Sequence, residues 1–155
     1  MKKKFYIFAI IVAIVGIFLF LSQKSFLRYH ALMQQEDPLF SDMGVYVFQI
    51  EDKYPVLLEK NGRVFAAVEF SAERVAVKIR GVQLPQIDDI LGAQGKTIEE
   101  IENTFGKPHI NTGSGFYIPS YITSDGYLIK IWVSNGMVTN VTRIDLLTGE
   151  VVEWY

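Results

Sequence analysis

The residues whose types could support catalysis or metal binding are two histidines, His30 and His109, and one pair of adjacent acids, Asp88 and Asp89. The histidines are far apart in a chain without Cys, and no HExxH spacing occurs, so they predict no zinc site. Adjacent residues on a helix point about 100° apart, which disfavours convergence of the two aspartates on one metal ion or substrate. A Ser–His–Asp constellation stays open, although the chain has no Gly-x-Ser-x-Gly turn.

The segment 92–97 ends in Gly-Lys-Thr, which are the residue types of a phosphate-binding loop. Such a loop also begins with a glycine, and the matching position in this chain is Ile90. We therefore expect no nucleotide here. The sequence predicts neither a cofactor nor a metal ion.

A row of basic residues, Arg74, Lys78 and Arg80, lines one face of a predicted strand. Such a row is either an anion site or, more commonly, a solvated face, and Glu69 on the neighbouring strand can offset part of its charge. The solvated face is the preferred interpretation.

Charge is unevenly distributed along the chain. The whole chain has 15 basic and 17 acidic residues, but the first 30 residues carry five basic side chains and no acid. The rest of the chain is therefore strongly acidic. Because phosphate contacts need clustered Lys and Arg, the sequence excludes nucleic acid as an expected partner.

The N-terminal basic cluster precedes an uncharged, almost wholly apolar run from Phe5 to Leu21. A helix of that length approaches the roughly 30 Å hydrocarbon thickness of a bilayer, so the run predicts a transmembrane helix contacting the lipid bilayer through residues 5–21. Lys2, Lys3 and Lys4 would stay cytoplasmic, which places the following domain outside the cell. A cleaved signal peptide is the alternative, although the run is long for one and lacks an Ala-x-Ala site.

Three segments follow from this interpretation. Residues 1–24 form the Lys cluster and anchor, residues 25–43 form a juxtamembrane stalk that ends near Asp37-Pro38, and residues 44–155 form an extracytoplasmic domain. Hairpin turns are predicted at Asn61-Gly62, at Asp125-Gly126 and at Asn135-Gly136, because these dipeptides tolerate the positive φ that tight turns need.

A short amphipathic helix is predicted after Thr97, because Thr97 and Glu100 form a capping-box pattern. Gly106 and Pro108 end it. The sequence thus predicts an α+β fold class, in which an N-terminal transmembrane helix is followed by one antiparallel sheet domain packed against a short capped helix.

Aromatic residues of the C-terminal strands are the candidate protein-binding residues: Tyr117, Tyr121, Tyr127 and Trp132. A sheet with one helix on it leaves one face open, and Tyr and Trp suit protein interfaces. Alternation with Ile129, Ile131 and Val133 places Trp132 on the open face. A partner, the membrane surface or the N-terminal half of the same chain could cover it.

The pattern Gly95-Lys96-Thr97-x-x-Glu100-Ile101-x-x-x-Phe105-Gly106-x-Pro108 resembles the helix motif of the β-lactamase-inhibitor-protein-like fold (BLIP-like), a group that includes the small lipoprotein of the outer-membrane barrel-assembly machinery. The resemblance covers about residues 86–147. It implies a bacterial envelope protein, not an enzyme, whose sheet face binds other proteins. The lipid-attachment Cys of that lipoprotein is absent here.

The functional expectation combines these inferences. We expect a membrane-tethered extracytoplasmic protein-binding module of the bacterial cell envelope, without enzymatic activity, whose partner is another envelope protein. An envelope inhibitor or immunity protein is an alternative that differs only in its partner. A small envelope hydrolase is the other alternative, and it would require a closed polar pocket that gathers titratable groups.

Overall fold

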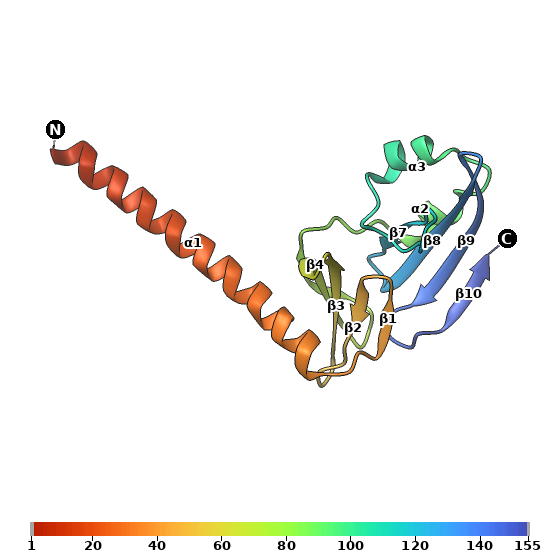
Figure 1. Cartoon of the computed structure of the whole chain (residues 1–155), viewed down its shortest axis with the longest axis horizontal. Coiled ribbons are helices and arrows are strands. Elements are labelled where there is room, and N and C mark those ends of the chain that lie inside the picture. The colour runs from red at the N-terminus through yellow and green to blue at the C-terminus, as the bar shows by residue number, and fades with distance from the viewer. Residues whose placement is uncertain (1, 155) are drawn as a thin grey trace. The chain divides into compact units, whose positions relative to one another are not determined.

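The computed structural model describes the backbone of residues 2–154 and the side chains of residues 10–17, 27–86, 88 and 90–151. The chain divides into two compact units, Met1–Glu36 and Asp37–Tyr155. The first unit is the helix α1 (Lys2–Gln35). The second unit contains the remaining helices and all of the strands that the described residues form (Figure 1).

Two antiparallel sheets of five strands each form the second unit. The first sheet has the order β1-β2-β3-β4-β5, with the bounds β1 (Phe40–Asp42), β2 (Val45–Val47), β3 (Lys53–Lys60), β4 (Arg63–Ser71) and β5 (Ala76–Arg80). The second sheet has the order β10-β9-β8-β7-β6, with the bounds β6 (Ile110–Asn111), β7 (Pro119–Ile122), β8 (Tyr127–Ser134), β9 (Met137–Asp145) and β10 (Val151–Trp154). The helices α2 (Ile87–Leu91) and α3 (Ile98–Phe105) connect the two sheets in the chain.

The predicted fold class is therefore wrong in its sheet: there are two sheets where one was expected. The physical reason is that the second sheet has two apolar faces. Its residues Ile122, Leu128 and Ile144 pack with Val56 and Val68 of the first sheet in one buried cluster. A single sheet under a short helix would have left that face in water.

The opposite face of the second sheet forms a separate core with the helices. Ile129, Ile131 and Val141 pack there against Ile90 of α2 and Ile101 of α3. The unit is thus built in three layers, first sheet, second sheet and helices, and Figure 1 shows α2 and α3 beside β7 and β8. The two-sided burial explains why all four residues of β7 are buried.

The three predicted hairpin turns are confirmed, and β-bulges change the register beyond Asn61-Gly62 and Asn135-Gly136. At Asn135-Gly136, Val133 pairs with Val138, and a bulge then sets Ile131 opposite Val141. Without the extra residue, Ile131 would face Asn140 and an amide would point into the apolar core. Because a bulge inserts one residue into one strand, it keeps the apolar side chains of both strands on the same face.

The two hairpins among β3, β4 and β5 also contain a bulge. Leu58 pairs with Ala66 because of a bulge at Leu58/Glu59, and without the extra residue it would face Phe65. Between β4 and β5, Val68 pairs with Ile79, and the register shifts between Glu69 and Phe70.

The capped helix is confirmed at its N-terminus. Thr97 Oγ1 accepts a hydrogen bond from the Glu100 N–H at 3.2 Å, and a Glu100 carboxylate oxygen accepts one from the Thr97 N–H at 2.8 Å. These bonds satisfy two backbone donors that the first helical turn leaves without partners. The helix ends before Gly106, whose φ is +81°.

The prediction of a transmembrane helix over Phe5–Leu21 is contradicted. In the part of the chain that the structure describes, no helix is long and apolar enough to cross a membrane. The described side chains of this run, residues 10–17, span only about 12 Å of helix, against a hydrocarbon core of about 30 Å. The rest of the run, residues 5–9 and 18–21, lies outside the described side chains. The predictions of a single-pass topology and of a membrane localisation depended on this helix, so they are contradicted as well.

The stalk predicted over residues 25–43 overlaps two structural elements. The helix α1 continues to Gln35, close to the predicted stop at Asp37-Pro38, and β1 already begins at Phe40. The first sheet therefore starts before the predicted domain boundary at residue 44.

Among the described residues, two ion pairs connect the two sheets. Lys130 Nζ of β8 lies 2.7 Å from an Asp42 carboxylate oxygen of β1, and the Arg74 guanidinium in the β4–β5 turn bonds to Asp145 of β9. Burial raises the pKa of Asp145, but the hydrogen bonds from Arg74 and from the Leu147 N–H outweigh that effect, so the pKa lies below its ordinary value. These pairs tie together surfaces that the apolar core already holds in contact.

Candidate functional site

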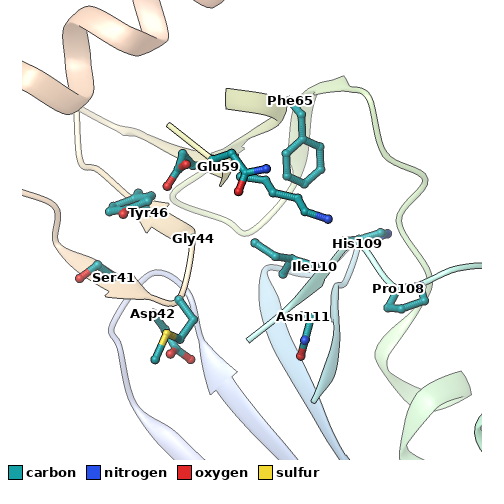
Figure 2. Close-up of a pocket in the computed structure, with 13 residues that line it drawn as sticks. Ser41, Asp42, Gly44, Tyr46, Glu59, Phe65, Pro108, His109, Ile110 and Asn111 are labelled. Atoms are coloured by element: carbon teal, nitrogen blue, oxygen red, sulfur yellow. The ribbon is translucent and has the colours of Figure 1, made fainter. Parts of the chain in front are cut away.

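A hollow lies where the hairpins of the first sheet approach the edge strand of the second sheet. It has a volume of about 740 Å³. In Figure 2, Glu59 and Phe65 of the β3–β4 hairpin lie across the hollow from His109 and Ile110. The full lining is Ser41, Asp42, Met43, Gly44, Tyr46, Glu59, Lys60, Asn61, Phe65, Pro108, His109, Ile110 and Asn111.

The hollow continues into two smaller ones along the same surface. A hollow of about 310 Å³ shares Phe65, Pro108 and His109 with the first, and one of about 280 Å³ shares Gln83 and Phe105 with the second. Residues of the segment 104–111, which runs from the end of α3 to β6, line all three. We call these three hollows together the trough.

Gly44 shapes the floor of the trough at the tip of the β1–β2 hairpin. Its φ is +89°, and a Cβ at this position would lie 2.6 Å from the Glu59 carbonyl oxygen and 2.8 Å from Ile110 Cδ1. Only glycine allows both this backbone conformation and this close approach. The glycine thus lets the hairpin of the first sheet rest directly on the edge strand of the second.

His109 is held rigidly between two backbone segments. Its Nδ1 accepts a hydrogen bond from the Ile122 N–H at 2.9 Å, which leaves Nε2 protonated to donate to the Gln83 carbonyl oxygen at 2.7 Å. Burial lowers the pKa of the imidazole below its ordinary value, and the bond to Gln83 opposes this only in part. Both ring nitrogens are occupied, so His109 positions the wall of the trough and has no nitrogen available for proton transfer to a ligand.

The carboxylates of the trough are engaged within the fold as well. Asp42 pairs with Lys130, and a Glu59 carboxylate oxygen accepts from the Gly62 N–H in the β3–β4 turn. Among the described residues, no group of three or more acids or histidines is placed to hold a metal ion. The lining therefore offers contact surface and hydrogen-bonding groups to a ligand, while Asp42, Glu59 and His109 already have partners within the fold.

The four predicted protein-binding residues do not form one surface. Tyr121 is fully buried and donates to the Gly106 carbonyl oxygen at 2.9 Å, so it offers no surface to a partner. Tyr127 is half-buried, with the Arg74 and Arg143 guanidinium carbons 5.0 Å and 4.7 Å from its ring centroid. These two tyrosines are part of the interior of the unit.

Tyr117 and Trp132 are exposed, with 48% and 42% of their surface in contact with solvent. The Tyr117 hydroxyl donates to Glu102 of α3 at 3.1 Å, and the Trp132 indole N–H donates to Thr142 on the adjacent strand at 2.8 Å. Trp132 lies on the face of the second sheet that the first sheet covers at Leu128 and Ile144. The N-terminal half of the chain therefore covers much of the face that was predicted to be open, while Trp132 itself stays exposed.

The basic row is divided between two environments. Arg74 turns inward to Asp145, whereas Lys78 and Arg80 lie on β5, opposite Glu69 and Ala67 of β4. Asp88 is exposed on α2, and the side chain of Asp89 lies outside the described residues. The Gly-Lys-Thr segment serves as the entrance to α3, in agreement with the capping pattern.

Sequence reasoning missed the trough because its lining comes from turns and hairpin tips. The turn residues Met43, Gly44 and Asn61 were detectable as loops, but only the packing of one sheet on the other brings them beside Pro108 and Ile110. Comparisons of the chain with protein-family models, with curated proteins and with solved structures found no match. The resemblance to the β-lactamase-inhibitor-protein-like fold thus stays a prediction.

Proposed function

We propose that the unit Asp37–Tyr155 is a non-enzymatic binding module whose trough accepts an extended polypeptide segment. The observation that carries this proposal is the row of three hollows that share lining residues along 104–111. Small-molecule sites enclose most of their ligand, whereas a long open depression suits an extended chain.

The lining supports a polypeptide ligand in its chemistry. Phe65 and Met43 are exposed apolar contacts, with 38% and 53% of their surfaces accessible. Ser41 and Asn61 supply donors and acceptors of the kind that pair with peptide groups, and Asn111 supplies its amide N–H donors, because its oxygen accepts from the Gly113 and Ile118 N–H groups. Asp42, Glu59 and His109 are already bonded to other groups of the fold, which argues against catalysis at this site.

The test is selection of random peptides displayed on phage against the full chain, followed by affinity measurements on matched variants. Phe65→Ser and Met43→Ser alter the trough, while Phe116→Ser and Met137→Ser make the same changes at exposed positions outside its lining. We expect the trough variants to weaken the selected peptides by about tenfold or more, because exposed apolar anchors dominate such interfaces.

The two control variants should bind as the wild-type chain does. Equal losses in trough and control variants, or a library that yields no specific peptide, would contradict the proposal. Circular dichroism of each variant establishes that the loss is one of binding and not of folding.

A further inference from the structure

The strand β5 forms one edge of the first sheet. It pairs with β4 on one side, and it is the last strand in the order β1-β2-β3-β4-β5. An edge strand presents backbone N–H and C=O groups that can pair with an additional strand. Within the described part of the chain, no strand pairs with the outer side of β5.

The apolar residues of this strand are unusually exposed. Val77 and Ile79 have 55% and 47% of their surfaces accessible, and Val75 just before the strand has 58%. Ile79 lies opposite Val68, a buried residue of the core between the sheets, so it stands at the open rim of that core. A strand added at this rim would extend the core and remove Ile79 from water.

The opposite face of the same strand is basic. Lys78 and Arg80 lie opposite Glu69 and Ala67, and the described ion pairs include neither cation. Arg74, the third member of the basic row, is directed to Asp145 and does not contribute to this face. Two cations therefore face one carboxylate, and the edge carries an excess positive charge in an otherwise acidic unit.

We propose that β5 docks a partner segment that adds a sixth strand to the first sheet and in which apolar and acidic residues alternate. The apolar residues of that segment lie beside Ile79 at the rim of the core. Its acidic residues lie beside Lys78 and Arg80, because directly opposed and diagonal side chains of opposite charge stabilise a strand pair. This surface is distinct from the trough, and it adds a second specificity to the proposed binding module.

A second copy of this chain fits the edge less well than an acidic segment does. In a two-fold antiparallel pairing centred on the middle of β5, Lys78 faces its own symmetry mate. Like charges directly opposite each other destabilise a strand pair. A lysine on an edge strand also opposes unspecific strand addition. The charge of β5 thus selects for an acidic partner.

The experiment measures binding of labelled synthetic peptides to the full chain by fluorescence anisotropy. One peptide alternates valine with glutamate, a second alternates valine with lysine, and a third contains the valines and glutamates in two separate blocks. The variant Lys78→Glu/Arg80→Glu reverses the charge of β5. The matched variant Lys53→Glu/Arg63→Glu makes the same change at exposed positions of β3 and β4.

We expect the wild-type chain to prefer the alternating glutamate peptide, and the β5 variant to lose about tenfold of that affinity and to gain affinity for the lysine peptide. The matched variant, Phe65→Ser and Met43→Ser should all retain the affinity for the glutamate peptide. This result therefore tests the β5 proposal independently of the proposed function of the trough. Absence of glutamate-peptide binding, or equal binding of all three peptides, overturns the proposal. A concentration-dependent dimer in sedimentation analysis that Lys78→Glu/Arg80→Glu changes would assign the edge to a second copy instead.

Discussion

His109 illustrates how a residue of catalytic type can be structural. Its two nitrogens bridge the Ile122 N–H of the second sheet and the Gln83 carbonyl of the segment that follows β5. The side chain also lies edge-on to the Tyr121 ring, with 5.6 Å between centroids. The bond from the Ile122 N–H requires the neutral imidazole, because a protonated Nδ1 cannot accept it, whereas Nε2–H can donate to Gln83 in either protonation state.

This arrangement predicts a loss of stability in mild acid. Burial lowers the folded-state pKa of His109, so the unfolded chain binds the proton more readily than the folded one. The contribution is fully present above the unfolded pKa of about 6.5 and is lost as the pH falls below it, by at most about 1.4 kcal/mol per pH unit. Urea unfolding of the full chain between about pH 7.5 and pH 5.5 measures it.

His109→Gln is the comparison variant, because it keeps a donor and an acceptor but does not titrate in this range. Its unfolding midpoint should change less with pH than that of the wild-type chain. Parallel pH profiles would show that a group other than His109 causes the effect, because the two proteins differ only at this position.

At the scale of the elements, the sequence predicts the hairpin turns but not the β-bulges. Asn-Gly and Asp-Gly dipeptides predict hairpins because the positive φ of their residues is a local property, and Asn61 and Asn135 indeed have φ values of 54° and 51°. A bulge depends on which faces of the finished sheet are buried. The choice between Asn140 and Val141 as the partner of Ile131 therefore follows from the core above it.

The candidate site was less predictable than the strands. Tyr121 and Tyr127 are of residue types that are common at interfaces. Tyr121 instead packs in the core between the second sheet and the helices, and Arg74 and Arg143 lie over the Tyr127 ring. The trough depends on residues about forty positions apart, such as Phe65 and Pro108, which become neighbours only after two sheets pack. No local pattern in the sequence specifies that packing.

The capping box of α3 allows a direct test at this scale. Thr97→Ala removes the acceptor of the Glu100 N–H bond and should lower the free energy of unfolding by about 1 kcal/mol. Thr104→Ala makes the same change within the helix, where the hydroxyl only donates to the Glu100 carbonyl oxygen. Denaturant midpoints should fall for Thr97→Ala and stay nearly constant for Thr104→Ala. Equal shifts would mean that the cap contributes nothing specific.

At the scale of the whole unit, the ion pair between Arg74 and Asp145 holds the first sheet to the second. Asp145→Asn removes the charge, while its remaining carbonyl oxygen can still accept from the Leu147 N–H. We expect a loss of about 1–3 kcal/mol, as for other hydrogen bonds between charged groups. A double-mutant cycle with Arg74→Met isolates the pairwise energy, and a coupling near zero would contradict the assigned role.

The order of the two sheets along the chain has a consequence for synthesis. The first sheet is complete at Arg80, whereas Leu146, which belongs to the core between the sheets, comes roughly 65 residues later in the chain. At about 5–20 residues per second, the ribosome needs about 3–13 seconds to synthesise that stretch. During this interval the apolar side chains of Val56, Val68 and Phe70 have no second sheet to cover them. The nascent chain is therefore exposed to aggregation at one defined stage, and a chaperone that shields apolar strands would act there.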